Sequence, residues 1–479
     1  MHDRQRRASF QKSRLREVVD WLFSREWRRS HWLVALIWIA ALLTIQWRAG
    51  QGFITQANHD LTRHDQDAYL ALARANLPFI WPAYADGIHA PLFPFLIKSW
   101  AGEDNAQFFT AAKEANVLFG MGATVLLAIY FLRKLPPLPA MNVGTISALI
   151  ILPASAFVTP EVIYYTAFFF FWVVGWRLLV RNPLSAYALA GVLCAATYLA
   201  KPSTLLLSAC LVALSLWRWK QVESSGTEDT TWTGRRFLIG FVVSFLCFLI
   251  PVLPKAYDAY QRTGDPFENA AEYCVWMDDA AHCVPLLHDF PNHRFKEWPK
   301  AQQPSALNYW NHHSMGQIWA RLSSGIVAQA NNFLLGEKSV KSALRSYSHI
   351  RSVMPLRGAY PLALLLGTFL LATQSASGKS RTLTDRHMLW ALAALGFTVH
   401  FLAISFYTPI VNGDRLILAV YIPVLFSLAL GIEYLREERA NGWRVEVVQV
   451  IHMLIAGHLA WSLIQLSLTG VFGEPRDTM

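Results

Sequence analysis

The sequence predicts an all-α polytopic membrane protein with about eleven transmembrane helices and two long non-cytoplasmic loops. Of its 479 residues, 54% are hydrophobic and only 15% are charged, whereas about a quarter of the residues in a soluble domain are charged. Apolar runs of about twenty residues recur along the chain, the length that a helix needs to cross roughly 30 Å of hydrocarbon. This pattern excludes a soluble globular protein.

The predicted spans are separated by short polar connectors and by two long polar segments. The spans fall near residues 32–47, 114–132, 142–158, 161–180, 184–200, 203–219, 236–254, 356–373, 387–406, 415–435 and 447–470.

The same pattern divides the chain into four parts. Both outer loops are too long to be simple turns and too short to be full domains, so we expect them to pack on each other and on the helix ends. The parts are a cytoplasmic basic amphipathic segment at 1–30, a transmembrane core at 31–254 that includes a first outer loop at 48–112, a large outer loop at 255–354, and C-terminal transmembrane helices at 355–479.

The positions of Lys and Arg predict the orientation. The formal net charge is +10. Lys and Arg gather in the first thirty residues and in every second connector, and the order of the spans places all of these segments on the same side of the membrane. The positive-inside rule assigns that side to the cytoplasm, so both long loops lie outside, on the periplasmic or extracellular face of what we expect to be a bacterial inner (plasma) membrane. No basic stripe interleaved with aromatic residues is present, which argues against a nucleic-acid partner.

The first outer loop carries an acidic cluster in NHDLTRHDQDAYLALARANL, residues 58–77. Asp65 and Asp67 lie next to His64 and precede apolar residues at helical spacing. One interpretation is a short interfacial helix that these acids cap. A second is a carboxylate acting as general base at the membrane surface. A third interpretation is a divalent metal site built from His64, Asp65 and Asp67. The local sequence does not distinguish these three interpretations.

Two charged residues lie at predicted outer helix ends. Glu161 follows Pro160, which is typical of a helix start, although its carboxylate can also line a site. Lys201 stands alone between two apolar spans, on the side where the positive-inside rule disfavours a cation. An ionisable residue at that depth is a functional candidate that can hold a lipid phosphate. The alternative is that Lys201 reaches lipid headgroups.

A third charged residue lies at the outer start of a late span, in VNGDRLILAVYIPVL at residues 411–425. Arg415 has planar, bidentate donors that suit a phosphate or pyrophosphate. The alternative is a helix capped by Asp414 with an interfacial Arg415 beside it.

The large outer loop gives weaker signals. Its histidines have irregular spacing and form no metal-binding motif. Cys274 and Cys283 both lie in this loop, where they form a disulfide or stay free thiols depending on the compartment.

The motifs, taken in order, resemble the GT-C glycosyltransferase superfamily. Within it, the chain is similar to the protein-mannosyltransferase and aminoarabinose-transferase-like family, of the glycosyltransferase family 39 type. The resemblance covers roughly residues 32–220 and returns weakly over 386–435. Its motifs are DQDAY at 65–69, HAPLFP at 89–94, PE at 160–161, LAKP at 199–202 and DRLILAVYIP at 414–423.

This resemblance implies a GT-C-like transmembrane core and a glycosyltransferase that takes its sugar from a polyprenyl-phosphate donor. The acceptor would be a lipid, a glycan or a protein. The catalytic base would be Asp65 or Asp67, because Gln66 stands where the family often has a second acid. The implied substrate-binding residues are Glu161, Lys201, Arg415, His89 and Tyr69. No cofactor is implied with certainty, and a divalent metal ion stays open.

The main alternative function is a polytopic transporter or lipid flippase. Such a protein is expected to carry ionisable residues near mid-span and internal repeats. In this sequence the ionisable residues cluster at outer helix ends, which favours an enzyme.

Overall fold

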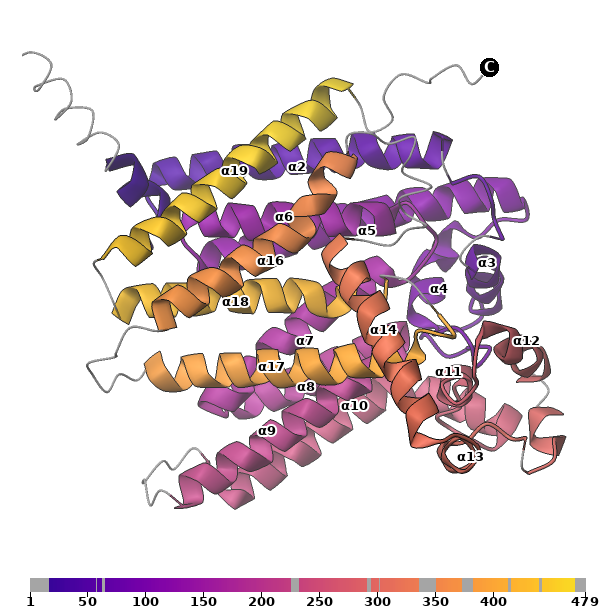
Figure 1. The fold of residues 1–479 in the computed structure, drawn as a ribbon. Coiled ribbons are helices and arrows are strands. Elements are labelled where there is room, and N and C mark those ends of the chain that lie inside the picture. Colours follow the sequence, from indigo (N-terminus) through magenta and orange to yellow (C-terminus); the bar gives the residue numbers. More distant parts are fainter. Residues whose placement is uncertain are drawn as a thin grey trace, which may run out of the picture.

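The computed structural model describes residues 17–56, 58–62, 65–224, 232–290, 294–300, 302–335, 350–372, 382–411, 415–438 and 442–469. Within these ranges the regular structure is entirely helical. The long helices form one bundle, and short helices gather at one end of it (Figure 1). The all-α prediction is confirmed.

The bundle is built from long helices that run back and forth. They are α2 (Arg29–Gln56), α5 (Asn105–Lys134), α6 (Pro137–Ser155), α7 (Glu161–Arg181), α8 (Leu184–Ala200), α9 (Leu205–Ser224), α10 (Gly234–Thr263), α14 (Met315–Leu335), α16 (Ile350–Ala372), α17 (Thr382–Tyr407), α18 (Leu418–Glu438) and α19 (Trp443–Thr469).

Shorter elements connect them. They are α3 (Gln66–Ala75), α4 (Leu92–Ile97), η2 (Lys98–Trp100), η3 (Pro202–Thr204), α11 (Ala270–Cys274), α12 (Ala280–Asp289), η5 (Arg294–Glu297) and α13 (Ala306–His312).

The membrane spans agree with the sequence. Among the described residues, nine helices are long and apolar enough to cross a membrane, and Leu184–Ala200 and Arg357–Ala372 are two shorter apolar helices. Each coincides with one of the predicted spans, so the polytopic fold class is confirmed. Of the predicted basic segment at 1–30, residues 1–16 lie outside the described part, and residues 17–22 are helical.

The first outer loop is shorter than the predicted 48–112. Helix α2 continues to Gln56, and α5 already begins at Asn105, where the Asp104 side chain accepts a hydrogen bond from the backbone N–H of Ala106. Gly50 lets α2 pack closely on α5, because a Cβ there would lie 2.8 Å from Val117 of α5.

The predicted large loop at 255–354 also contains more helix than expected. Helix α10 runs on to Thr263 and ends at Gly264, whose φ of 75° is the left-handed conformation common after a helix. Helix α14 then lies against α17, so closely that a Cβ on Gly325 would be 1.9 Å from the carbonyl oxygen of Ser405. The sequence did not predict α14, because polar residues interrupt its apolar ones and leave no continuous apolar run.

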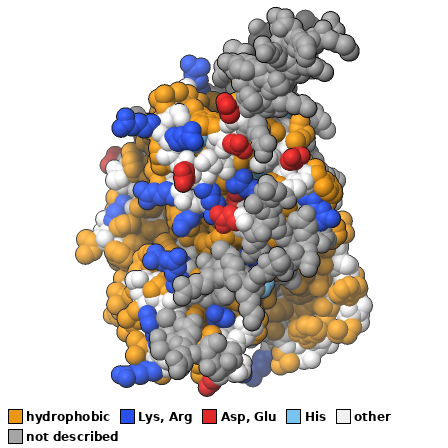
Figure 2. Space-filling view, turned by 90° about the vertical axis from the view of Figure 1, so that its left-hand side faces the viewer, with side chains coloured by type: hydrophobic (Ala, Val, Ile, Leu, Met, Phe, Trp, Pro, Cys, Tyr) orange, Lys and Arg blue, Asp and Glu red, His pale blue; other side chains and the backbone are white. Residues whose placement is uncertain are grey.

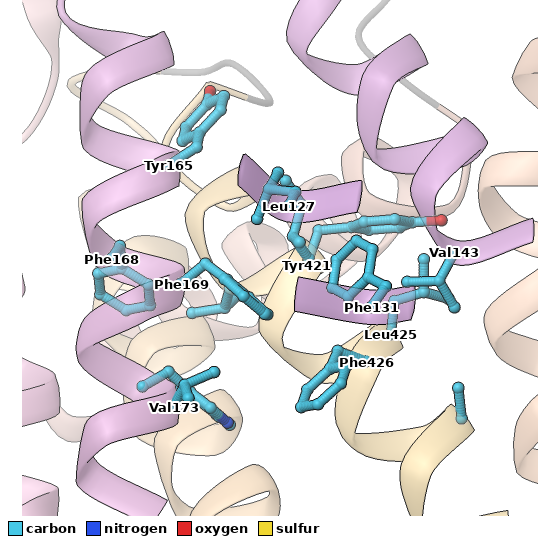
Figure 3. Close-up of a cluster of buried hydrophobic side chains, with 14 of the residues drawn as sticks. Leu127, Phe131, Val143, Tyr165, Phe168, Phe169, Val173, Tyr421, Leu425 and Phe426 are labelled. Carbon is cyan, nitrogen blue, oxygen red and sulfur yellow. The ribbon is translucent and has the colours of Figure 1, made fainter. Parts of the chain in front are cut away.

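Aromatic side chains fill the centre of the bundle (Figure 3). The rings of Phe131 from α5, Phe169 from α7 and Phe426 from α18 have centroids between 5.4 and 5.7 Å apart. All three side chains are fully buried. Edge and offset contacts of this kind add to the burial of apolar area and hold α5, α7 and α18 together.

One end of the bundle carries many Lys and Arg side chains. Lys and Arg side chains are spread over the end opposite α3 and α4 (Figure 2). Helices α5 and α7 finish at that end with Arg133, Lys134 and Arg181. The positive-inside rule predicts such a distribution for the cytoplasmic end.

Candidate active site

Asp65 lies immediately before α3 and does not cap it. Its backbone is left-handed, with φ 63° and ψ 23°, and its side chain makes no cap hydrogen bond. That conformation costs an L-residue roughly 1–2 kcal/mol, and Asp is among the few residue types that adopt it. The helix-cap interpretation therefore does not describe Asp65, whose side chain is 54% exposed.

Gln66, where the resembled family often has an acid, has a structural position. Its side chain is fully buried. The amide nitrogen donates to Asn58 Oδ1 at 2.9 Å and to the carbonyl of Asp60 at 3.0 Å, and its oxygen accepts from Asn58 Nδ2 and from the N–H of Val158. A carboxylate in place of this amide has no N–H group, so the hydrogen bonds to Asn58 and Asp60 would be lost. Glutamine at position 66, where the family often has an acid, therefore stabilises the fold of the first outer loop.

His89 stands between two carboxylates of the first outer loop. Its Nδ1 lies 2.8 Å from Asp86 Oδ2, and its Nε2 lies 3.9 Å from Asp65 Oδ2. Burial lowers the pKa of the His89 imidazole, but its contacts with Asp65 and Asp86 outweigh burial and raise the pKa to about 9. His89 is therefore an imidazolium at neutral pH, and its charge favours the ionised form of Asp65.

Glu161 and Lys201 form a buried ion pair between the outer ends of α7 and α8. Lys201 Nζ lies 2.7 Å from Glu161 Oε1, and the two side chains are 15% and 5% exposed. Lys201 also lies 5.9 Å from the centre of the Tyr164 ring. Lys201 is therefore paired inside the protein and does not reach lipid headgroups. Glu161 is its partner as well as the first residue of α7.

Arg415 enters the same region from the segment before α18. The Tyr165 hydroxyl donates to the Arg415 carbonyl at 2.6 Å. Within the described ranges, the guanidinium itself has no hydrogen bond or ion pair. Burial lowers the pKa of Arg415, but the negative charges of Glu161 and Asp65 outweigh burial and raise the pKa. A half-buried guanidinium with unused donors is suited to bind an anion.

Tyr69 connects the two halves of this cluster. Its ring lies 5.0 Å from the His89 ring in an edge-on contact. Burial raises the pKa of the Tyr69 phenol well above its usual value, with Glu161, Arg415 and Asp65 each acting on it through their charges. The structure therefore brings Asp65, Tyr69, His89, Glu161, Lys201 and Arg415 to one region, at the end of the bundle that carries α3 and α4.

Asp67, another predicted candidate, has no contact with this cluster among the described residues. The exposed carboxylate of Asp67 accepts a hydrogen bond from the backbone N–H of Ala68 at 2.9 Å. His64 lies outside the described residues, as does Asp414, which precedes Arg415.

The divalent metal site finds no support in the residues that the structure describes. In that part of the chain, no three His, Cys, Asp or Glu side chains are placed to hold a metal ion. His64, one of the three predicted ligands, lies outside the described residues, so the divalent metal ion stays a prediction.

The sequence analysis missed two residues of the site. The Asp86 carboxylate lies within hydrogen-bonding distance of the His89 ring and also accepts hydrogen bonds from the backbone N–H groups of Ile88 and His89. An acid three residues before the histidine in a D-G turn is a local signal that could have revealed it. Tyr165 follows Glu161 by four residues, the spacing that places both on one helix face.

The large outer loop packs beside this cluster. A disulfide joins Cys274 to Cys283, with Cα atoms 5.6 Å apart. The guanidinium of Arg321 on α14 donates to the carbonyls of Val275, Met277 and Phe406. These contacts fasten the loop to the outer end of α17, from which the chain continues to Arg415.

Comparison with known proteins identifies a fold and no family. No family model and no curated protein sequence matches the chain. The crystal structure of the Archaeoglobus fulgidus oligosaccharyltransferase in the apo form is similar, with a TM-score of 0.52 and 12% sequence identity over 91% of this chain. Our chain spans about half the length of that enzyme, since 55% of it is covered. The likeness shows that this chain shares the fold of the matched part of that oligosaccharyltransferase.

Proposed function

We propose that this protein is a glycosyltransferase that moves a sugar from a polyprenyl-phosphate donor to an acceptor on the outer face of the membrane. One observation carries the proposal. The Arg415 guanidinium, which has no hydrogen bond or ion pair within the described residues, lies among Asp65, Tyr69 and the Glu161–Lys201 pair. An anion site next to a carboxylate is what transfer from a phosphate ester requires.

The chemistry is a single displacement. The Asp65 carboxylate takes the proton of the acceptor nucleophile as that atom bonds to the anomeric carbon of the donor. The bond between the anomeric carbon and the phosphate oxygen breaks, and its electron pair leaves on the polyprenyl phosphate. Arg415 and Lys201 stabilise the negative charge on that leaving group. Attack from the face opposite the phosphate inverts the anomeric centre.

His89 positions the base in this scheme. A carboxylate acts as a general base when it is ionised and held towards the acceptor. The His89 imidazolium, 3.9 Å from Asp65 Oδ2, favours the ionised form, while Asp86 fixes the orientation of the ring. Asp65 is therefore a better candidate for the base than the exposed Asp67.

The location fits a donor anchored in lipid. The polyprenyl tail would stay in the bilayer and present the sugar phosphate at the outer helix ends, where the cluster lies. The basic face at the opposite end supports a cytoplasmic N-terminus. The Cys274–Cys283 disulfide supports an oxidising compartment for the large loop. In a bacterium this corresponds to the periplasmic side of the inner membrane, with a lipid, glycan or protein as acceptor.

The test compares Asp65→Asn with Asp67→Asn in purified protein, using polyprenyl-phosphate sugars and membrane acceptor fractions. We expect Asp65→Asn to slow sugar transfer by about 100- to 10,000-fold, the contribution of a general base. Asp67→Asn should keep nearly full activity, since its carboxylate contacts only the neighbouring N–H. Wild-type rates in Asp65→Asn would remove Asp65 as the base.

A further inference from the structure

An uncharged stretch connects the two parts of the first outer loop that carry site residues. Helix α3 follows Asp65, and residues 76–85 then lead towards His89. This stretch has the sequence NLPFIWPAYA and contains no charged side chain. The mechanism proposed above uses none of its residues. Residues 77–81, in its middle, form what is called here the apolar tip.

The side chains of the apolar tip project away from the protein. Ile80 is 96% exposed, Leu77 is 53% exposed and Trp81 is 46% exposed. Single exposed apolar residues are common on a protein surface, whereas several together mark a surface that contacts an apolar partner. Transfer of such side chains from water into hydrocarbon is favourable. The exposed side chains of the tip therefore favour contact with lipid over contact with water.

The polar groups around the tip face the protein instead. Lys98 of η2 donates from Nζ to the carbonyl oxygens of Phe79 and Asn76. The Asn76 side chain donates to the carbonyl of Tyr84 at 2.9 Å and accepts from the N–H of Tyr84 at 3.2 Å. The two prolines of the stretch have no N–H to satisfy. Non-helical backbone is tolerated at membrane depth where the protein satisfies its polar groups, and these bonds do so on both sides of the tip.

A contact with α10 gives the depth of the tip. Trp81 Nε1 donates to the carbonyl of Pro251 at 2.8 Å. Helix α10 is long and apolar enough to cross a membrane, and few of its residues are buried in the protein. Ile250 and Leu253 are exposed beside this contact, and Tyr257 is exposed nearer the outer end of the helix. Tyrosine is enriched at membrane–water interfaces, and Pro251 lies about 9 Å further from that end than Tyr257 at the rise of an α-helix.

We propose that the apolar tip inserts among the phospholipid acyl chains of the leaflet at the α3 end of the bundle. The tip continues the lipid-facing surface of α10, which is why acyl chains rather than a second protein cover it. Because Asp65 and His89 lie on either side of the stretch that carries the tip, its insertion would hold both residues at the membrane surface. The inference does not depend on the proposed sugar transfer.

The experiment places the photoreactive residue benzoylphenylalanine at position 80 of the full-length protein. The protein is held in nanodiscs of phosphatidylethanolamine and phosphatidylglycerol. Ultraviolet light joins the probe to the group that it contacts, and mass spectrometry identifies the adduct. We expect adducts to acyl chains.

The matched control is the same probe at position 284. Val284 of α12 is also an exposed aliphatic residue, but the exposed polar residues His282 and His288 lie near it on the helix. Acyl-chain adducts should be about tenfold more frequent at position 80, because burial of an isoleucine side chain favours hydrocarbon by at least that factor. Equal frequencies at the two positions would overturn the proposal.

A second comparison keeps the probe at position 77 and changes Ile80. Ile80→Asp should reduce acyl-chain adducts about tenfold, since a carboxylate is costly in hydrocarbon. Ile80→Leu should leave their frequency unchanged. Equal adduct frequencies in these two variants would contradict insertion of the tip. Adducts confined to lipid headgroups would place the tip outside the acyl chains, and adducts to a second copy of the protein would replace lipid as the partner, so either result would also overturn the proposal.

Discussion

The two outer loops use their charged residues in different ways. In the first loop, Asp65 and His89 lie at the cluster formed with the outer helix ends. In the large loop, the charges near its attachment points bind the loop itself, as when Arg321 donates to three carbonyls and His313 pairs with Asp278 at 2.8 Å. In the proposed mechanism the first loop supplies the base, whereas the charged residues of the large loop hold that loop in place.

The largest expected effect concerns the buried pair that supports the first loop's cluster. Lys201→Met leaves Glu161 without its partner in a buried place and should destabilise the protein by about 3–5 kcal/mol. The double variant Glu161→Gln with Lys201→Met should regain much of this stability, because no buried charge is left. Thermal unfolding of the purified variants in one detergent measures both effects.

The reference for that measurement is Asp67→Asn, which should leave the unfolding temperature close to the wild-type value. If Lys201→Met unfolded at the same temperature as this reference, the ion pair would contribute nothing. The contrast between the loops would then lose its main support.

A smaller effect is expected at the attachment of the large loop. Arg321→Met removes three hydrogen bonds to the carbonyls of Val275, Met277 and Phe406, and should cost about 2–3 kcal/mol of loop attachment. Limited proteolysis should then cleave the large loop faster, while binding of bare polyprenyl phosphate stays near wild type. Weaker binding of polyprenyl phosphate with unchanged proteolysis would contradict this, because Arg321 would then act at the phosphate site and not in attaching the large loop.

His89 adds a pH dependence to the stability of the first loop. Its folded-state pKa, raised to about 9, lies above the ordinary value of 6.5. Its contribution to stability is thus complete below about pH 6.5 and is lost as the pH rises through about 9. Unfolding temperatures measured between pH 6 and 10 should fall more in wild type than in His89→Gln. Parallel curves would show that the imidazolium does not form.

The sequence predicted the fold well because hydropathy and charge are local properties that each span carries. It also pointed to Asp65, Glu161, Lys201 and Arg415, since a charge at an outer helix end stands out from an apolar run. It could not decide between Asp65 and Asp67. The backbone at residue 65 and the contact with His89 separate them, and neither is visible in a string of residues.

Other features depend on tertiary packing and leave no local signal. Lys255 reads as the polar end of a span, and Glu268 as one acid in a long loop. Only the folding of the loop over α8 and α10 brings them into one pocket. Helix α14 was missed because contact with α17, through Gly325 and Gln329, stabilises a stretch whose own pattern is mixed.

The central claim is that Arg415 and Lys201 hold a lipid phosphate beside Asp65. A cryo-electron microscopy structure of the full-length protein with polyprenyl phosphate tests it most directly. We predict the phosphate within hydrogen-bonding distance of the Arg415 guanidinium, on the side that faces Asp65 and Tyr69. A phosphate bound at the basic opposite end of the bundle, with the outer cluster unchanged, would contradict the claim.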